Sequence, residues 1–151
     1  MARSGAQLEV EQWIRTKWLP GFLGRDFQAK AERIPLKSGG FFKFDAVSAD
    51  GQIVANISTS RYRTAKGKIG SGKMHKVRSD IYFLCLASAE EKLMLLTETD
   101  MHDAWCKEAH SGRVPDAIEI LLVKDIPDDL RENLERARLK ASREVTPQLS
   151  G

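Results

Sequence analysis

A lone acid within an apolar, strand-like run is the first candidate for chemistry. Asp45 lies in the run 41–48, where its neighbours are mostly aromatic or aliphatic. An Asp-Gly turn at 50–51 separates this run from a second one, residues 52–58, and that combination is typical of a β-hairpin. In such a hairpin Asp45 and Asn56 lie near each other. Their oxygen atoms could help to hold a hard cation such as Mg²⁺.

The same hairpin predicts a candidate catalytic centre. Asn56 and Ser58 face the same way, because side chains two apart on a strand share a face. A Mg²⁺ or Mn²⁺ ion held by Asp45 and Asn56 could activate a water and stabilise the transition state of phosphodiester hydrolysis. The first helix offers a further oxygen donor, Glu11 or Glu9. The alternative interpretation is that Asp45 only caps or pairs at a sheet edge and the helix acids are solvated.

A basic segment follows this hairpin. No Asp or Glu occurs between Ser58 and Ser79, whereas Lys and Arg recur throughout. Clustered cations supply sequence-independent affinity for nucleic acid by releasing counterions, and Tyr62 among them could stack on a base. The sequence therefore predicts a nucleic-acid-binding protein, with DNA as the favoured ligand, unless the segment is only a solvated charged face. The predicted contact residues are Arg61, Arg63, Lys66, Lys68, Lys73 and Lys76.

Part of this basic segment also imitates a phosphate-binding loop. Residues 67–74 nearly match the pattern G-x-x-x-x-G-K-[ST], but Met74 stands where the pattern needs a hydroxyl group. A P-loop nucleotide-binding protein is therefore a third, less favoured interpretation. It requires Lys73 at a helix N-terminus that directly follows a strand.

Hydrophobic periodicity and turn signals predict the elements that position these residues. We expect an α/β fold with a mixed central sheet flanked by helices, in one domain over residues 1–145 and with a disordered tail over 146–151. Pro20 is expected to end the first helix, and Asp100 is expected to cap the third. The expected helices are 7–19, about 73–88, 100–110 and one from Pro127 onward; the expected strands are 27–36, 41–48, 52–58, 92–97 and 117–123.

This order of elements, with Asp45 before the turn and Ile57 flanked by Asn56 and Ser58, resembles the PD-(D/E)XK, or restriction-endonuclease-like, nucleases. The resemblance covers residues 7–97, which would form the helix, three strands, helix and strand of that core. It implies that Asp45 is the motif aspartate, Asn56 stands at the second acid and Ser58 at the lysine. It further implies that a glutamate of the first helix faces the metal and that Lys73 can substitute for the missing lysine.

Two functions follow from the resemblance. One is a Mg²⁺- or Mn²⁺-dependent phosphodiester hydrolase, with Asp45, Asn56 and Glu11 holding the metal and Ser58 and Lys73 completing the catalytic set. The other is a catalytically inactive nucleic-acid-binding or interaction subunit on the same fold, because Asn56 and Ser58 depart from the motif. A second carboxylate beside Asp45 would distinguish them.

Composition bounds the location and partners of the chain. It has 151 residues, a net charge of +3 and two cysteines without metal-ligand spacing. Two thiols of this kind favour a reducing compartment, and residues 1–11 lack the apolar core of a signal peptide. The longest apolar run, 81–87, is too short to span a bilayer. We therefore expect a cytoplasmic protein with no membrane contact; a homodimer or a protein partner remains open.

Overall fold

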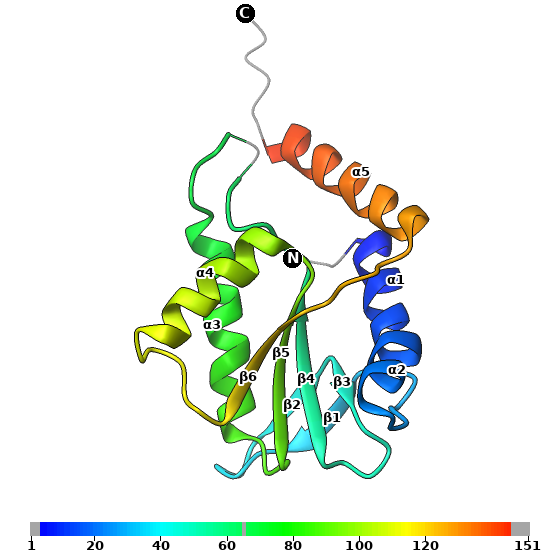
Figure 1. Ribbon diagram of the computed structural model, residues 1–151, viewed down its shortest axis with the longest axis vertical. Coiled ribbons are helices and arrows are strands. Elements are labelled where there is room, and N and C mark those ends of the chain that lie inside the picture. Colours follow the sequence, from blue (N-terminus) through cyan, green and yellow to red (C-terminus); the bar gives the residue numbers. More distant parts are fainter. Residues whose placement is uncertain (1–3, 65, 146–151) are drawn as a thin grey trace, which may run out of the picture.

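A mixed four-stranded sheet forms the centre of the computed structural model, which describes residues 4–64 and 66–145 (Figure 1). The strand order is β3-β4-β5-β6, with β3 antiparallel to β4 and the other neighbours parallel. β4 and β5 are almost wholly buried, as expected for parallel strands that are covered on both faces. The strands are β3 (Ala46–Val47), β4 (Ile53–Ser58), β5 (Glu91–Leu96) and β6 (Ile118–Leu122).

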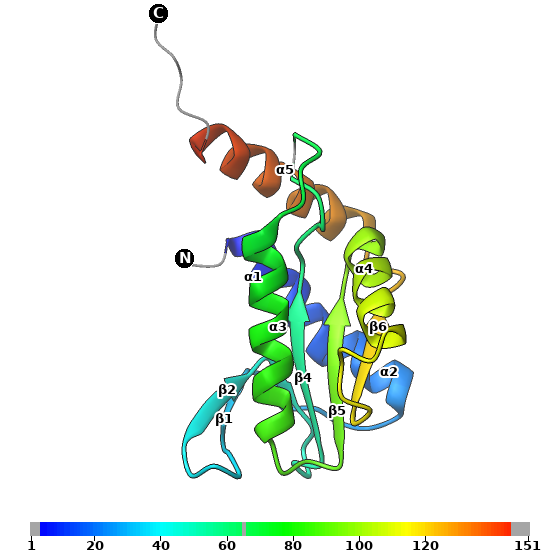
Figure 2. The same cartoon turned by 90° about the vertical axis from the view of Figure 1, so that its left-hand side faces the viewer.

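Helices cover both faces of this sheet (Figures 1 and 2). On one face, α3 (Ser71–Leu86) and α4 (Thr99–His110) pack on Val54, Met94 and their neighbours. On the other face, Ile53, Ala55 and Ile57 of β4 pack against the N-terminal helices and the last helix. Those helices are α1 (Gly5–Trp13), the π-helical η1 (Ile14–Trp18), α2 (Leu19–Leu23) and α5 (Asp128–Val145). The predicted α/β class, with helices on a mixed sheet, is confirmed.

A separate two-stranded hairpin, formed by β1 (Glu32–Pro35) and β2 (Phe41–Phe44), lies beside α3 (Figure 2). The ring of Phe42 stacks on Phe83 of α3 with 4.2 Å between the ring centroids, which ties the hairpin to that helix. The predicted strand 27–36 is therefore wrong in length, although Pro35 does lie at the end of a short strand.

The predicted continuous strand 41–48 is also wrong, because the chain changes partners at Asp45. Its first part, β2, pairs with β1, and its second part, β3, pairs with β4. Alternating apolar residues indicate an extended chain but not which strand the chain pairs with. The predicted antiparallel pairing with 52–58 is therefore confirmed only for Ala46 and Val47.

The first helical segment does not end at Pro20, as the sequence predicted, but continues to Leu23. Pro20 lies in the first turn of α2, where its ring fits and its missing N–H costs little. The π-helical turn η1 connects α1 to α2, and Gly24, with a φ of 66°, ends the segment in the left-handed conformation.

The α4 terminus differs from the prediction too. Asp100 is not the N-cap residue, which is Glu98, and the Asp100 carboxylate is used by the basic segment instead. The predicted tail, residues 146–151, lies outside the described residues. Among the described helices, none is long and apolar enough to cross a bilayer.

Candidate functional site

Asp45 and Asn56 do lie together, as predicted, and each side chain accepts a hydrogen bond from a backbone N–H group. The Asn56 Oδ1 atom accepts a hydrogen bond from the Asp45 N–H at 3.3 Å, and the Asp45 Oδ2 atom accepts from the Ile57 N–H at 2.8 Å. The β3–β4 register would place Phe44 opposite Ile57, but Phe44 pairs with Glu32 of β1 instead. The Asp45 carboxylate thus supplies a partner to the β4 backbone where the strand changes sheets.

Asn56 also joins the sheet to α3. Its Nδ2 atom donates to the Asp80 carbonyl at 3.1 Å, and the side chain is 1% exposed. On the same helix the Lys76 ammonium lies 2.7 Å from the Asp80 carboxylate. Both ends of the Asn56 amide therefore hold backbone groups, which accounts for a polar residue in the middle of a buried strand.

The predicted third donor, Glu11 or Glu9, belongs to the N-terminal helix α1. Glu11 is buried, whereas Glu9 is exposed. Val10, the neighbour of Glu11 on α1, packs in the core on the face of β4 that Ala55 and Ile57 share. Within residues 4–64 and 66–145, no three His, Cys, Asp or Glu side chains are grouped to hold a metal ion. The Asn56 amide is bonded to backbone groups at both ends, so the carboxylates left for the predicted site are those of Asp45 and Glu11. The Mg²⁺ or Mn²⁺ site at these residues stays a prediction.

Ser58, which stands at the motif lysine, is the last residue of β4, and Lys73, the predicted substitute for that lysine, lies in the first turn of α3. The Ser58 hydroxyl accepts from the Ser60 N–H at 3.3 Å in the turn that leaves β4. Lys73 precedes Asp80 by seven residues on α3, about 10 Å along the helix axis. Its charged neighbours are Arg138, Asp100 and Arg61, so it belongs to a different cluster from Asp45.

The basic segment folds into a small hairpin, residues 59–64 and 66–70, that we call the basic hairpin. Arg63 and Ile69 form a bridge, the Thr64 N–H donates to the Lys68 carbonyl, and Gly67 turns the chain with a φ of 77°. The side chains of Lys66 and Lys68 at its tip are exposed. The segment is thus an ordered presentation of basic side chains rather than an unstructured loop.

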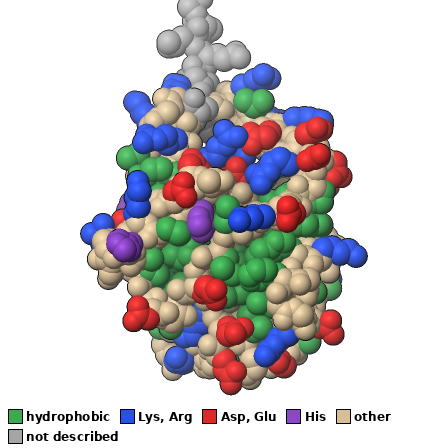
Figure 3. All heavy atoms as spheres, in the orientation of Figure 1, with side chains coloured by type: hydrophobic (Ala, Val, Ile, Leu, Met, Phe, Trp, Pro, Cys, Tyr) green, Lys and Arg blue, Asp and Glu red, His purple; other side chains and the backbone are tan. Residues whose placement is uncertain are grey.

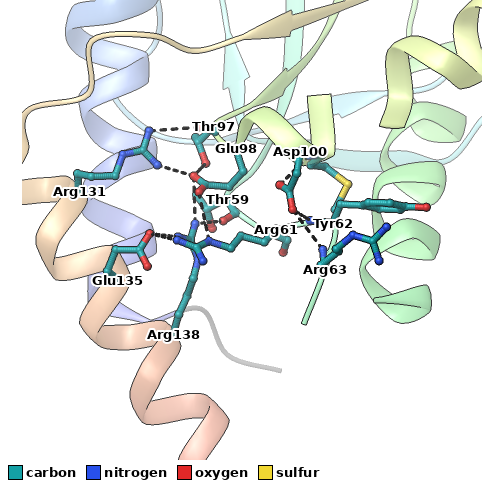
Figure 4. A network of polar contacts seen from close by, with 12 residues as sticks. Thr59, Arg61, Tyr62, Arg63, Thr97, Glu98, Asp100, Arg131, Glu135 and Arg138 are labelled. Carbon is teal, nitrogen blue, oxygen red and sulfur yellow. Dashed lines mark hydrogen bonds and ion pairs between the residues drawn. The ribbon is translucent and has the colours of Figure 1, made fainter. Parts of the chain in front are cut away.

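Two acids from distant elements anchor the basic hairpin (Figure 4). The Asp100 Oδ2 atom accepts from the backbone N–H groups of Tyr62 and Arg63, at 3.0 and 3.3 Å. Glu135 of α5 accepts from the Arg61 Nη2 atom at 2.7 Å. These contacts fix the base of the hairpin against α4 and α5.

An arginine cluster lies at the ends of β4 and β5, where the basic hairpin meets α5 (Figure 4). Its centre is Glu98, which is 7% exposed and lies 2.5 Å from Arg131, 3.1 Å from Arg138 and 3.8 Å from Arg61. Arg138 also donates to the Thr59 carbonyl and lies 2.6 Å from Glu135. We call these five residues, Glu98, Glu135, Arg61, Arg131 and Arg138, the strand-end cluster.

The electrostatics of this cluster are set by burial and by the guanidinium groups. Burial alone would raise the pKa of Glu98, but Arg138, the Thr97 hydroxyl and Arg131 together bring that pKa below its ordinary value. The pKa of Lys73 is lowered, first by burial and then by Arg138 and Arg61, against the opposing effect of Asp100. Positive charge therefore exceeds the local supply of acids here.

The sequence-based prediction missed the contribution of α5. Exposed basic residues continue along the C-terminal half of this helix, beside the basic hairpin, and Figure 3 shows Lys and Arg gathered at this end of the molecule. Their grouping from residue 136 onward was a visible signal, but nothing local indicated that α5 reaches residues 59–61. The side chains are Arg136, Lys140 and Arg143.

A hollow of about 400 Å³ lies between the basic hairpin and α4. Tyr62 and Met74 form part of its lining, and the Arg63 guanidinium lies 5.7 Å from the centre of the Tyr62 ring. The acidic and basic side chains Asp103, Lys107 and Arg113 complete a polar rim. The hollow therefore offers an aromatic surface beside the basic hairpin.

The P-loop geometry is not formed. Lys73 does lie in the first turn of α3, but residues 59–70 separate that helix from β4. The Gly70 and Ser71 N–H groups donate to the carbonyls of Tyr62 and Ile69, so they are used within the chain.

No family model, curated protein or solved structure matches the sequence or the fold.

Proposed function

We propose that this protein binds nucleic acid, most favourably DNA, through a surface made by the basic hairpin and the C-terminal half of α5. The observation that carries the proposal is the anchored hairpin, whose exposed Lys66 and Lys68 belong to the same end of the molecule as α5 with its exposed Arg136 and Lys140 (Figure 1). Sequence-distant basic side chains thus converge on one end of the molecule. Such a surface binds phosphates by electrostatic attraction and by releasing their counterions.

The order of elements supports a restriction-endonuclease-like framework. An N-terminal helix, antiparallel strand pairs, a crossover helix and a parallel strand follow one another as that core requires. Asp45 and Asn56 lie together at the motif positions. The proposed protein is a non-cleaving member of this class, because Asn56 and Ser58 are uncharged and their polar groups are bonded to backbone.

The two unpaired cysteines, Cys85 and Cys106, favour a reducing compartment, where a cytoplasmic nucleic-acid-binding protein would work.

The hollow beside Tyr62 supports contact with an unpaired base, since every base can stack on an aromatic ring.

The proposal is tested by replacing Lys66, Lys68 and Lys73 with alanine and measuring affinity for a labelled DNA duplex across a salt series. Each phosphate contact that is lost should flatten the plot of log affinity against log salt by about 0.9. The matched control replaces Lys30, Lys37 and Lys43 with alanine. These substitutions remove the same charge near the β1–β2 hairpin, at the opposite end of the molecule (Figure 1).

We expect the first triple variant to bind at least about tenfold more weakly and the control to retain most of its affinity. Equal losses in both variants would mean that only net charge matters, and absence of binding at low salt would refute the proposal. DNA cleavage in Mn²⁺ that Asp45→Ala abolishes would show instead that the protein is a hydrolase.

A further inference from the structure

We infer that Arg61 and Arg138 form a binding site for one phosphate group of the nucleic acid, and that the Glu135 carboxylate occupies this site in the free protein. The inference rests on the proposed nucleic-acid binding and assigns a specific place on that surface. A phosphate would displace Glu135 from the two guanidinium groups and take over its contacts.

The geometry of the arginine pair is that of an anion site. One oxygen of Glu135, Oε1, lies 2.7 Å from the Arg61 Nη2 atom and 2.6 Å from the Arg138 Nη1 atom. The two guanidinium groups converge on one oxygen (Figure 4). Their N–H groups can donate hydrogen bonds to phosphate oxygens in the same way. A phosphate group carries more oxygen acceptors than a carboxylate, so it can engage both arginines more fully.

The two glutamates of the strand-end cluster differ in a way that assigns them different roles. The Glu98 side chain is 8% exposed and holds Arg138 and Arg131 from beneath, whereas the Glu135 side chain is 37% exposed. A buried carboxylate with several charged partners is costly to displace, but an exposed ion pair contributes little stability. Glu98 thus keeps Arg138 in place while Glu135 can leave.

The surrounding charge favours the exchange. Arg61, Arg131, Arg138 and Lys73 face three acids, Glu98, Glu135 and Asp100. When Glu135 moves away, the remaining positive charge is available to an incoming phosphate. Arg61 is also part of the basic hairpin, so this site is continuous with the surface that binds the rest of the backbone.

The inference predicts that removing the competing carboxylate increases affinity. Glu135→Gln keeps the size of the side chain but removes its charge, and we expect roughly three- to tenfold tighter binding of a labelled DNA duplex at moderate salt. Glu132→Gln is the matched control, because it makes the same charge change one turn earlier on α5, where Glu132 pairs at 3.8 Å with the exposed Arg136.

A double variant and a stability measurement separate this role from a purely structural one. Adding Arg61→Gln to Glu135→Gln should abolish the gain, since one of the two phosphate ligands is lost. Glu135→Gln should also lower the melting temperature slightly, so stability and affinity should change in opposite directions. Inorganic phosphate at constant ionic strength should raise the melting temperature of Glu135→Gln more than that of Glu132→Gln.

Each outcome decides the matter. An affinity gain confined to Glu135→Gln and cancelled by Arg61→Gln supports the phosphate site. Equal gains in both glutamine variants, or no gain in Glu135→Gln, would overturn it while leaving nucleic-acid binding through Lys66 and Lys68 intact. Absence of DNA binding in the wild type and in every variant would remove the proposed function and this site together.

Discussion

The Asp45–Asn56 pair, where β3 meets β4, and the strand-end cluster, at the ends of β4 and β5, each contain a buried acid, yet the two acids have different partners. Asp45 accepts from the backbone N–H of Ile57, whereas Glu98 accepts from guanidinium groups. In the first region the polar atoms are used to join strands and a helix. In the second they position cations that remain within reach of a ligand. The partners of a buried acid, rather than its burial, indicate whether it shapes the fold or a binding surface.

Replacing Asn56 should have the largest effect, and it should be an effect on stability. Asn56→Leu leaves the Asp45 N–H and the Asp80 carbonyl without their side-chain partner. We expect a loss of about 2–4 kcal/mol in the free energy of unfolding, since each buried polar group left unpaired costs about 1–3 kcal/mol. Urea denaturation measures the loss, and Ser58→Ala, which removes one bond in a turn, is the milder control. Unchanged stability would mean that the pair does not hold the fold.

Glu98→Gln should have an intermediate effect with a characteristic pH dependence. Because the arginines hold the pKa of Glu98 below its ordinary value of 4.5, its ionised form favours folding. That contribution is present above about pH 4.5 and is lost as the pH falls through the folded-state pKa. We expect Glu98→Gln to cost about 1–3 kcal/mol near neutral pH and proportionately less in acid.

Thermal or urea unfolding between neutral and acidic pH provides that measurement. Glu135→Gln is the internal comparison, since the exposed carboxylate should contribute much less to stability. If the free energy of unfolding of Glu98→Gln differs from that of the wild type by the same amount at every pH, the assigned role of Glu98 is contradicted.

The smallest effect is expected at Lys76, which the sequence grouped with the nucleic-acid contacts. Its ammonium is held by the Asp80 carboxylate, so it has less charge to offer a phosphate than Lys68 at the hairpin tip. We expect Lys76→Met to change DNA affinity by less than about twofold and Lys68→Met to weaken it by more, as measured by fluorescence anisotropy. The reverse order would place the binding surface along α3.

Structural features that depend on residues close in sequence could be predicted, whereas features that depend on residues far apart in sequence could not. The helices α3 and α4 and the strands β4 and β5 were predicted from local periodicity, because their burial pattern depends on neighbours along the chain. The change of partners at Asp45 was not, since an extended segment looks the same in either sheet. The strand-end cluster was also missed: its bonds join residues 74 and 79 positions apart, Arg61 to Glu135 and Thr59 to Arg138.

The site-residue predictions divide along the same line. The proximity of Asp45 and Asn56 followed from a turn signal that the local sequence carries. The burial of Glu11 depended on how a whole helix docks, which the hairpin does not determine.

The packing of α1 against α5 has a consequence for how the chain reaches its fold. Leu134 of α5 is 1% exposed and belongs to the same core as Val10 of α1 and Ile14 of η1. During synthesis α1 leaves the ribosome long before α5. The apolar face of α1 therefore stays exposed until α5 has been synthesised. Contacts so distant in sequence slow folding and leave early intermediates prone to aggregation. A nascent chain arrested before Asp128 should therefore be a ready client for chaperones that bind exposed apolar helices.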